Sequence, residues 1–368
     1  MAITRIGNPA LADIREPNFR NIIINGDMAV AQRATSTASI TSSGYYTLDR
    51  ARTAINNGGT WTQSQSTTVP TGQGFATSLK MDCTTADSSL SSGDFLHVQF
   101  PIEAQNLQYL KYGTDSAQTL TLSFWVRSNK TGTYCICLQK SDNTRYDYVA
   151  EYSISSADTW EKKTITIAPD SNIKAAGGAI DNDSGEGFKL KFTLLSSGRT
   201  GTNNTWNSST PADATSNQVN LADSTSNEWY VTGVQLEAGS VATDFEVIPH
   251  GVNLQRCQRY FYKLVDVPGG DAGGYFTSGF MYSGSILYSW NEFPTMMRAA
   301  PTLSVASGTD YYIFYRASAA DNLDDFDLTI GRPNGAMIRN NADVSGTGGD
   351  AGGIHSTSNS KVTFSAEL

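Results

Sequence analysis

The chain has 368 residues, a formal net charge of −9 and only 17% charged residues. An acidic chain repels nucleic acid unless it has a local basic patch, and this sequence has none, so nucleic acid is not expected as a partner. No apolar run approaches the roughly 20 residues that cross a bilayer, and the first residues lack the long apolar core of a secretory signal. We therefore expect a protein that is made in a cytoplasm and does not contact a membrane.

The composition favours an all-β fold. Hydrophobic residues make up 39% of the chain, and 33 glycines accompany many serines, threonines and asparagines. Such a composition is typical of many short strands joined by polar turns. With 17 Tyr, 15 Phe and 6 Trp, the chain has ample aromatic material for the core of a sheet.

Residues 1–19 carry little strand pattern and contain two prolines. We interpret them as an extended docking arm, because a short arm that cannot bury itself is either disordered or laid on a partner. The apolar contacts of a docked arm would be Ile6, Leu11 and Ile14. Disorder of the terminus is the alternative.

Residues 20–248 contain about ten short strand patterns with almost no helical periodicity. In the best of them, 119–128, Leu120, Leu122, Phe124 and Val126 alternate with polar residues. Glycine, serine and asparagine separate the patterns. This spacing predicts an antiparallel jelly-roll sandwich.

A second module follows the sandwich. Residues 249–263 are predicted to form a short linking helix, on which Leu254, Cys257 and Phe261 share one face. Residues 264–368 again show short strand patterns and are predicted to form a C-terminal β domain.

No catalytic motif surrounds the three histidines, so we expect no enzymatic activity. A pair of carboxylates across a glycan cleft is the alternative. Asp181, Asp183 and Glu186 surround a turn and could hold Ca²⁺, although their spacing is not that of an EF-hand. Solvated turn carboxylates are the other interpretation, and no other cofactor is expected. The four cysteines are interpreted as small buried apolar side chains.

Sugar binding is a further hypothesis, because sandwich modules stack sugar rings on exposed aromatic side chains. Trp206 lies in a polar loop and is a candidate platform, whereas Trp125, Trp160 and Trp229 lie in strand patterns and are expected in the core. Tyr146 and Tyr148 share a face and form a second candidate, with Arg145 beside them. Burial of these aromatic residues is the alternative in each case.

Several segments resemble parts of phage virion structural proteins. NIIINGDMAVAQR (21–33) and YYTLDR (45–50) are similar to their opening elements, and YVTGVQLEAGSVATDFE (230–246) is similar to part of the body of a carbohydrate-binding-module-like sandwich. CQRYF (257–261) and the final FSAEL are similar to their C-terminal domain. Ala51 stands where the family has a tryptophan after Asp-Arg, so one expected aromatic is missing.

This resemblance implies a virion fibre or surface protein, on the tail or the head, and a homotrimer. Trimerisation would bury sheet edges and the face of Leu254, Cys257 and Phe261. We expect a non-enzymatic structural protein that docks to the particle through its arm and displays β modules for attachment to the host surface. The alternatives are a glycan-binding receptor-recognition module and, third, a polysaccharide depolymerase.

Overall fold

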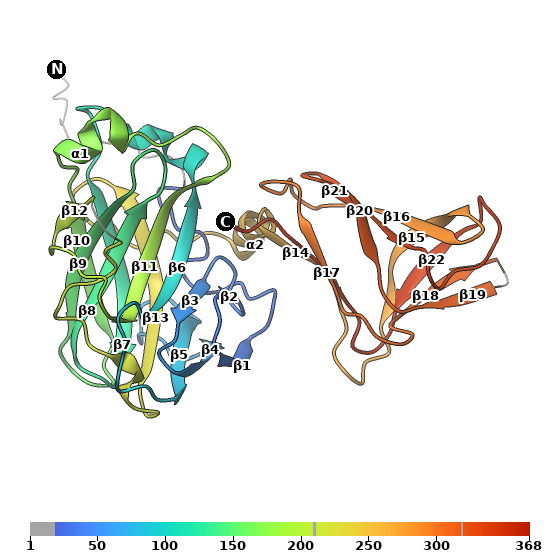
Figure 1. The fold of residues 1–368 in the computed structure, drawn as a ribbon, viewed down its shortest axis with the longest axis horizontal. Coiled ribbons are helices and arrows are strands. Elements are labelled where there is room, and N and C mark those ends of the chain that lie inside the picture. The colour runs from blue at the N-terminus through green and yellow to red at the C-terminus, as the bar shows by residue number, and fades with distance from the viewer. Residues whose placement is uncertain (1–18, 209–210, 318) are drawn as a thin grey trace, which may run out of the picture.

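The computed structural model describes residues 19–208, 211–317 and 319–368, which form two β modules joined by helix α2 (His250–Gln258) (Figure 1). The predicted all-β fold is confirmed. The predicted docking residues Ile6, Leu11 and Ile14 lie outside the described residues. Within these ranges, no helix is long and apolar enough to cross a membrane.

The first module is a sandwich of two antiparallel sheets, and most of its successive strands alternate between them. The six-stranded sheet has the order β1 (Ser36–Ile40), β4 (Thr60–Ser66), β5 (Ser78–Thr85), β13 (Glu228–Ala238), β7 (Leu120–Ser128), β10 (Glu161–Ile167). The seven-stranded sheet has the order β12 (Thr205–Asn207), β9 (Tyr146–Ile154), β8 (Gly132–Lys140), β11 (Glu186–Ser196), β6 (Phe95–Glu103), β3 (Arg52–Asn56), β2 (Gly44–Tyr45). The first module also contains four short helices between its strands: η2 (Ala104–Leu110), α1 (Ser171–Lys174), η3 (Ala176–Gly178) and η4 (Leu221–Asp223).

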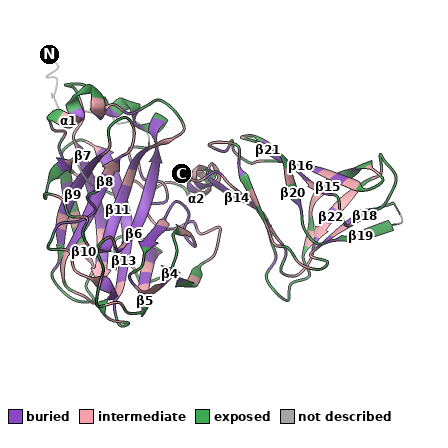
Figure 2. Ribbon diagram, in the orientation of Figure 1, coloured by how far each residue is buried: buried purple, intermediate pink, exposed green. Residues whose placement is uncertain are grey.

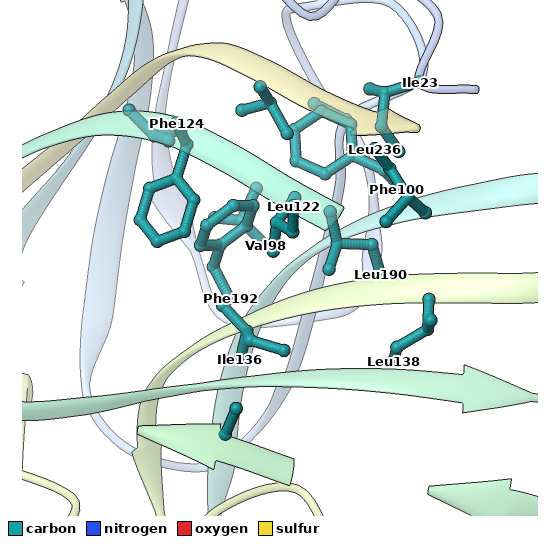
Figure 3. Close-up of a cluster of buried hydrophobic side chains, with 14 of the residues drawn as sticks. Ile23, Val98, Phe100, Leu122, Phe124, Ile136, Leu138, Leu190, Phe192 and Leu236 are labelled. Carbon is teal, nitrogen blue, oxygen red and sulfur yellow. The ribbon is translucent and has the colours of Figure 1, made fainter. Parts of the chain in front are cut away.

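The core of the sandwich lies between the two sheets, as the alternation in β7 predicted. Leu122 and Phe124 point inward from β7 toward the opposite sheet, where they meet Val98 and Phe192 (Figure 3). The rings of Phe124 and Phe192 pack edge to face with their centres 5.0 Å apart. Because full burial of one such side chain contributes about 1.5–3 kcal/mol, this layer holds the two sheets together.

The second module has a smaller core and a more exposed surface (Figure 2). Its three-stranded sheet has the order β14 (Phe261–Asp266), β23 (Lys361–Ser365), β17 (Thr302–Val305). Its seven-stranded sheet has the order β19 (Ala319–Leu323), β18 (Tyr312–Arg316), β22 (Ala351–Ser356), β15 (Gly274–Ser283), β16 (Ile286–Glu292), β21 (Gly335–Asn340), β20 (Asp327–Arg332). The core covers only one face of this larger sheet.

Helix α2 and the first residue of β14 pack against the chain itself, which corrects the predicted subunit interface. Cys257 and Phe261 are buried within the chain, and Leu254 is half-buried. The Phe261 ring lies 3.7 Å from the guanidinium carbon of Arg33 in the first module. Two of the three predicted residues are therefore not accessible to another subunit. All four cysteines are buried and free, as expected.

Candidate functional site

The structure contradicts the predicted exposure of Trp206. Trp206 lies in strand β12, which pairs with β9, and the residue is only 3% exposed. The indole nitrogen donates a hydrogen bond to the Ala168 carbonyl oxygen (3.0 Å), and the ring packs on Tyr148 with 5.2 Å between centres. Strand pairing between segments far apart in sequence has drawn this loop residue into the edge of the core, so the predicted platform is wrong.

The predicted platform of Tyr146 and Tyr148 is wrong as well. Tyr146 and Tyr148 do share a face, but that face points into the sandwich and both rings are buried. The Tyr148 hydroxyl donates to the Thr166 carbonyl oxygen (3.3 Å). Arg145 pairs with the buried carboxylate of Asp147 (Nη2–Oδ2 2.8 Å) and does not flank an exposed ring.

The predicted calcium ligands do not converge. Asp183 accepts a hydrogen bond from the Gly185 amide (2.8 Å), and Glu186 pairs with Lys189 (3.0 Å). Asp181 accepts from the Asn143 side-chain amide (3.2 Å). Across the described part of the chain, no group of three His, Cys, Asp or Glu side chains is placed to hold a metal ion. Calcium binding at this loop stays a prediction.

A large exposed aromatic surface lies instead on the second module. Of the eleven large hydrophobic side chains that are exposed among the described residues, six lie on the outer face of its seven-stranded sheet. Tyr275 and Tyr282 are 68% and 66% exposed. We define the aromatic face as the five aromatic members of this group together with the half-buried Tyr288, all from β15, β16 and β18: Tyr275, Phe280, Tyr282, Tyr288, Trp290 and Tyr315.

Strand register gathers these rings into two groups. Tyr275 lies 5.9 Å from Tyr315 and 5.2 Å from His355 between ring centres. Tyr288 lies 5.4 Å from Tyr282 and 6.2 Å from Phe280. The strands β18, β22, β15 and β16 are adjacent, and a strand spacing of about 4.8 Å extends the face over roughly 15 Å.

Glycines on neighbouring strands let two of the rings lie across the sheet. A Cβ atom at Gly353 would meet the Tyr275 ring at 2.7 Å, and a Cβ atom at Gly335 would meet the Trp290 ring at the same distance. A ring that lies across a glycine turns a flat surface to the solvent. The aromatic face can therefore stack on a flat apolar surface, such as the C–H face of a sugar ring.

The first module offers a second candidate site, a cavity of about 230 Å³ on the outer face of its six-stranded sheet. Trp125, on the polar face of β7, lines it together with Phe75 and Phe245. A bulge at Gly233 makes room for the Phe75 ring, which packs edge to face on Phe245 (5.1 Å between centres).

The polar groups of this cavity include Asp27 and Lys162. Burial raises the pKa of the Asp27 carboxyl, which also accepts a hydrogen bond from Asn253 (3.2 Å). Aromatic walls with a few converging polar groups are typical of small-molecule sites. Trp125, which we expected in the core, is half-buried at this surface.

Sequence reasoning missed both surfaces, although a signal existed for each. Trp125 alternates with Ser123 and Arg127 on the polar side of its strand, which points away from the core. In the hairpin of β15 and β16, aromatic residues recur every second position at 280 and 282 and again at 288 and 290. Period-two aromatic residues on both sides of one turn predict a shared face.

No protein-family model and no curated protein matches this sequence. Similar solved structures include the enzymatically active domain of tailspike protein 4 from bacteriophage CBA120 (TM-score 0.30, 11% identity, 60% of this chain). This chain spans only 22% of that tailspike chain. A putative sugar binding protein from Bacteroides thetaiotaomicron matches with TM-score 0.30, 13% identity, and coverage of 60% of this chain and 100% of that chain.

A family 11 carbohydrate-binding module from Clostridium thermocellum, in complex with a mixed-linked tetrasaccharide, is also similar. Its TM-score is 0.26 at 12% identity, with coverage of 60% of this chain and 97% of that chain. These low values assign no family to this chain, so its functional interpretation rests on the side chains described above.

Proposed function

We propose that this chain is a non-enzymatic virion surface protein that attaches to host glycans through its aromatic face. The glycan role is supported by one observation above all, the concentration of exposed Tyr, Phe and Trp side chains on one sheet. Contiguous exposed apolar surface of this kind marks interaction sites rather than ordinary monomer surface. The virion role is supported by the resemblance of segments 21–33, 230–246 and 257–261 to phage structural proteins.

The ring composition favours a sugar ligand. Four of the six side chains are tyrosines and one is tryptophan, so the face combines flat apolar surfaces with hydroxyl and N–H groups. A glycan needs both, because its C–H faces stack while its hydroxyls require hydrogen-bond partners. The cavity at Trp125 has the same combination on a smaller scale and is a second candidate contact of the same function.

A glycan array with the intact protein, followed by titration of the best ligand, tests this function. We expect Tyr282→Ala and Trp290→Ala to weaken binding two- to tenfold each, which corresponds to about 0.5–1.5 kcal/mol per aromatic contact. Val241→Ala removes an exposed apolar side chain from the other module, away from every cavity described here, and serves as the control. The absence of any array signal from the intact protein would refute glycan binding.

A second copy of the chain is the competing occupant of the aromatic face, because homotrimerisation is also predicted. Light scattering on the same variants separates the two. If Tyr282→Ala lowers the molar mass of the assembly and leaves glycan affinity unchanged, the face is a subunit interface. Release of oligosaccharide from host polysaccharide by the intact protein would contradict the non-enzymatic proposal and favour a depolymerase.

A further inference from the structure

A cleft separate from both candidate glycan sites lies where the sandwich meets helix α2. It has a volume of about 670 Å³, and its walls include Ile22, Ile24 and Pro101. Phe19 and Tyr109, both exposed, stand at the cleft. We call it the junction cleft. Its apolar lining lies in the other module from the aromatic face, so it offers a site that glycan binding there does not use.

Three arginines line the junction cleft, and two of them are neutralised. Arg50 pairs with Glu367, and Arg259 pairs with the buried carboxylate of Glu103 (Nη2–Oε1 2.5 Å). The two pairs leave no charge unmatched on that side of the cleft.

Arg256 is the exception. Within residues 19–208, 211–317 and 319–368, no carboxylate pairs with it, and its Nη1 atom is buried without a hydrogen-bond partner. Among the residues that the structure describes, its only hydrogen bond is long, from Nη2 to the Asn21 carbonyl oxygen (3.4 Å). The nearby carboxylate of Glu246 is already engaged by the backbone amides of Arg20 and Asn21 (3.2 and 2.9 Å).

A largely buried cation without a partner is costly, because desolvation is not offset by an ion pair. Burial accordingly lowers the pKa of Arg256. The guanidinium carbon lies 5.4 Å from the centre of the Phe19 ring, a cation–π contact that offsets only part of this cost and supplies no anion. An anionic group on an otherwise apolar ligand would satisfy the cation and cover the wall together.

We propose that the junction cleft binds an acidic segment of another protein, with a carboxylate on Arg256 and flanking aliphatic side chains on Ile22, Ile24 and Pro101. The lining favours protein side chains over a glycan, because most of its polar side chains, including Asn21 and Gln105, are already hydrogen-bonded within the chain and would leave sugar hydroxyls few partners. The charge of Arg256 selects an acidic segment over a neutral one. This site is independent of the proposed glycan function.

The first test needs no ligand. In the full chain without a partner, Arg256→Met should leave the thermal midpoint unchanged or raise it by about 2–4 °C, because it removes an uncompensated buried charge. The matched variant Arg259→Met leaves Glu103 buried without its cation and should lower the midpoint. If Arg256→Met lowers the midpoint as Arg259→Met does, Arg256 is a structural residue and the proposal is wrong.

The second test uses a labelled, capped peptide with one glutamate between isoleucines, and the same peptide with glutamine. Fluorescence anisotropy with the full chain should show the glutamine peptide binding at least tenfold more weakly, and Arg256→Met should abolish this difference. Arg332→Met, at an exposed arginine of the other module, should change nothing. Equal affinity for both peptides, or no binding of either, overturns the proposal.

Two further outcomes would assign the junction cleft to another occupant. Tighter binding of a synthetic peptide of residues 1–18 than of the glutamate peptide would make it a site for the chain's own N-terminal segment. Competition by an oligomer of glucuronic acid, stronger than by the glutamate peptide, would make it an acidic-sugar site. Either result overturns the proposal of a partner protein.

Discussion

His97 shows how a buried charge network decides the state of one side chain. It lies on the outer face of β6, where Lys191 and Arg199 already pair with Asp213 (2.6 and 2.8 Å). The His97 Nε2 atom is 3.7 Å from the Asp213 carboxylate, too far for a hydrogen bond. Burial lowers the pKa of His97 to about 3, since a third cation on one carboxylate would not repay its desolvation.

This depressed pKa predicts acid sensitivity. The unfolded chain takes up a proton near pH 6.5, whereas the folded chain resists until about pH 3, so stability is lost as pH falls from 6.5 toward 3. At pH 5 the loss is about 2 kcal/mol. Urea unfolding of the wild type and His97→Gln at pH 7 and pH 5 measures it, because the variant should lose that much less between the two pH values. An identical loss in both proteins contradicts a neutral His97.

The tryptophans mark the limit of prediction from single residues. Polar neighbours in sequence predicted exposure of Trp206, but pairing of β12 with β9 buries it. Exposure of a loop residue depends on contacts between distant segments, which local composition does not contain. Trp229 is buried as expected, while Trp125 and Trp160 are half-buried on the outer face of the same sheet.

Strands were predictable from alternation, but the face each strand buries was predictable only where one side is polar. The pattern at 119–128 corresponds to β7 (Leu120–Ser128), with its aliphatic side in the core. In β15 and β16 both sides are apolar: Met281 and Leu287 point inward, whereas Phe280 and Tyr288 point outward. Period two alone cannot say which side is covered, so the aromatic face emerged only from the folded module.

The contact between Gly353 and Tyr275 makes the aromatic face testable without altering an aromatic residue. A Cβ at Gly353 would meet the ring at 2.7 Å, so Gly353→Ala should lift the ring off the sheet. Because the ring can swing into solvent, the free energy of unfolding should change by less than about 1 kcal/mol. Glycan affinity measured by calorimetry should nevertheless fall two- to tenfold.

Gly274→Ala is the matched control for this prediction. It lies in the same strand, β15, and a Cβ there would meet nothing within 4 Å. If both variants bind glycan as the wild type does, the flat placement of the Tyr275 ring has no part in recognition.

The two modules form one unit through charged contacts at their junction rather than through a shared apolar core. Glu367, next to the C-terminus, pairs with Arg50 and with Arg33 (3.0 Å) of the first module. Arg298 of the second module donates to the Ser184 carbonyl oxygen of the first (2.7 Å). Arg50 also stacks on Tyr260, with its guanidinium carbon 3.6 Å from the centre of the ring. An interface of buried ion pairs is specific in geometry, since every charge must meet its partner.

Loss of one carboxylate should therefore uncouple the modules. Glu367→Gln leaves Arg50, which is 2% exposed, without its anion, and breaking such a buried pair costs about 3–5 kcal/mol. Asp266→Asn removes a pair with Lys263 whose side chains are about a third exposed, and should cost less than about 1 kcal/mol. Urea unfolding should show one cooperative transition for the wild type and the control, and two for Glu367→Gln, as each module unfolds alone. A single unshifted transition for Glu367→Gln would mean that the charged junction does not couple the two modules.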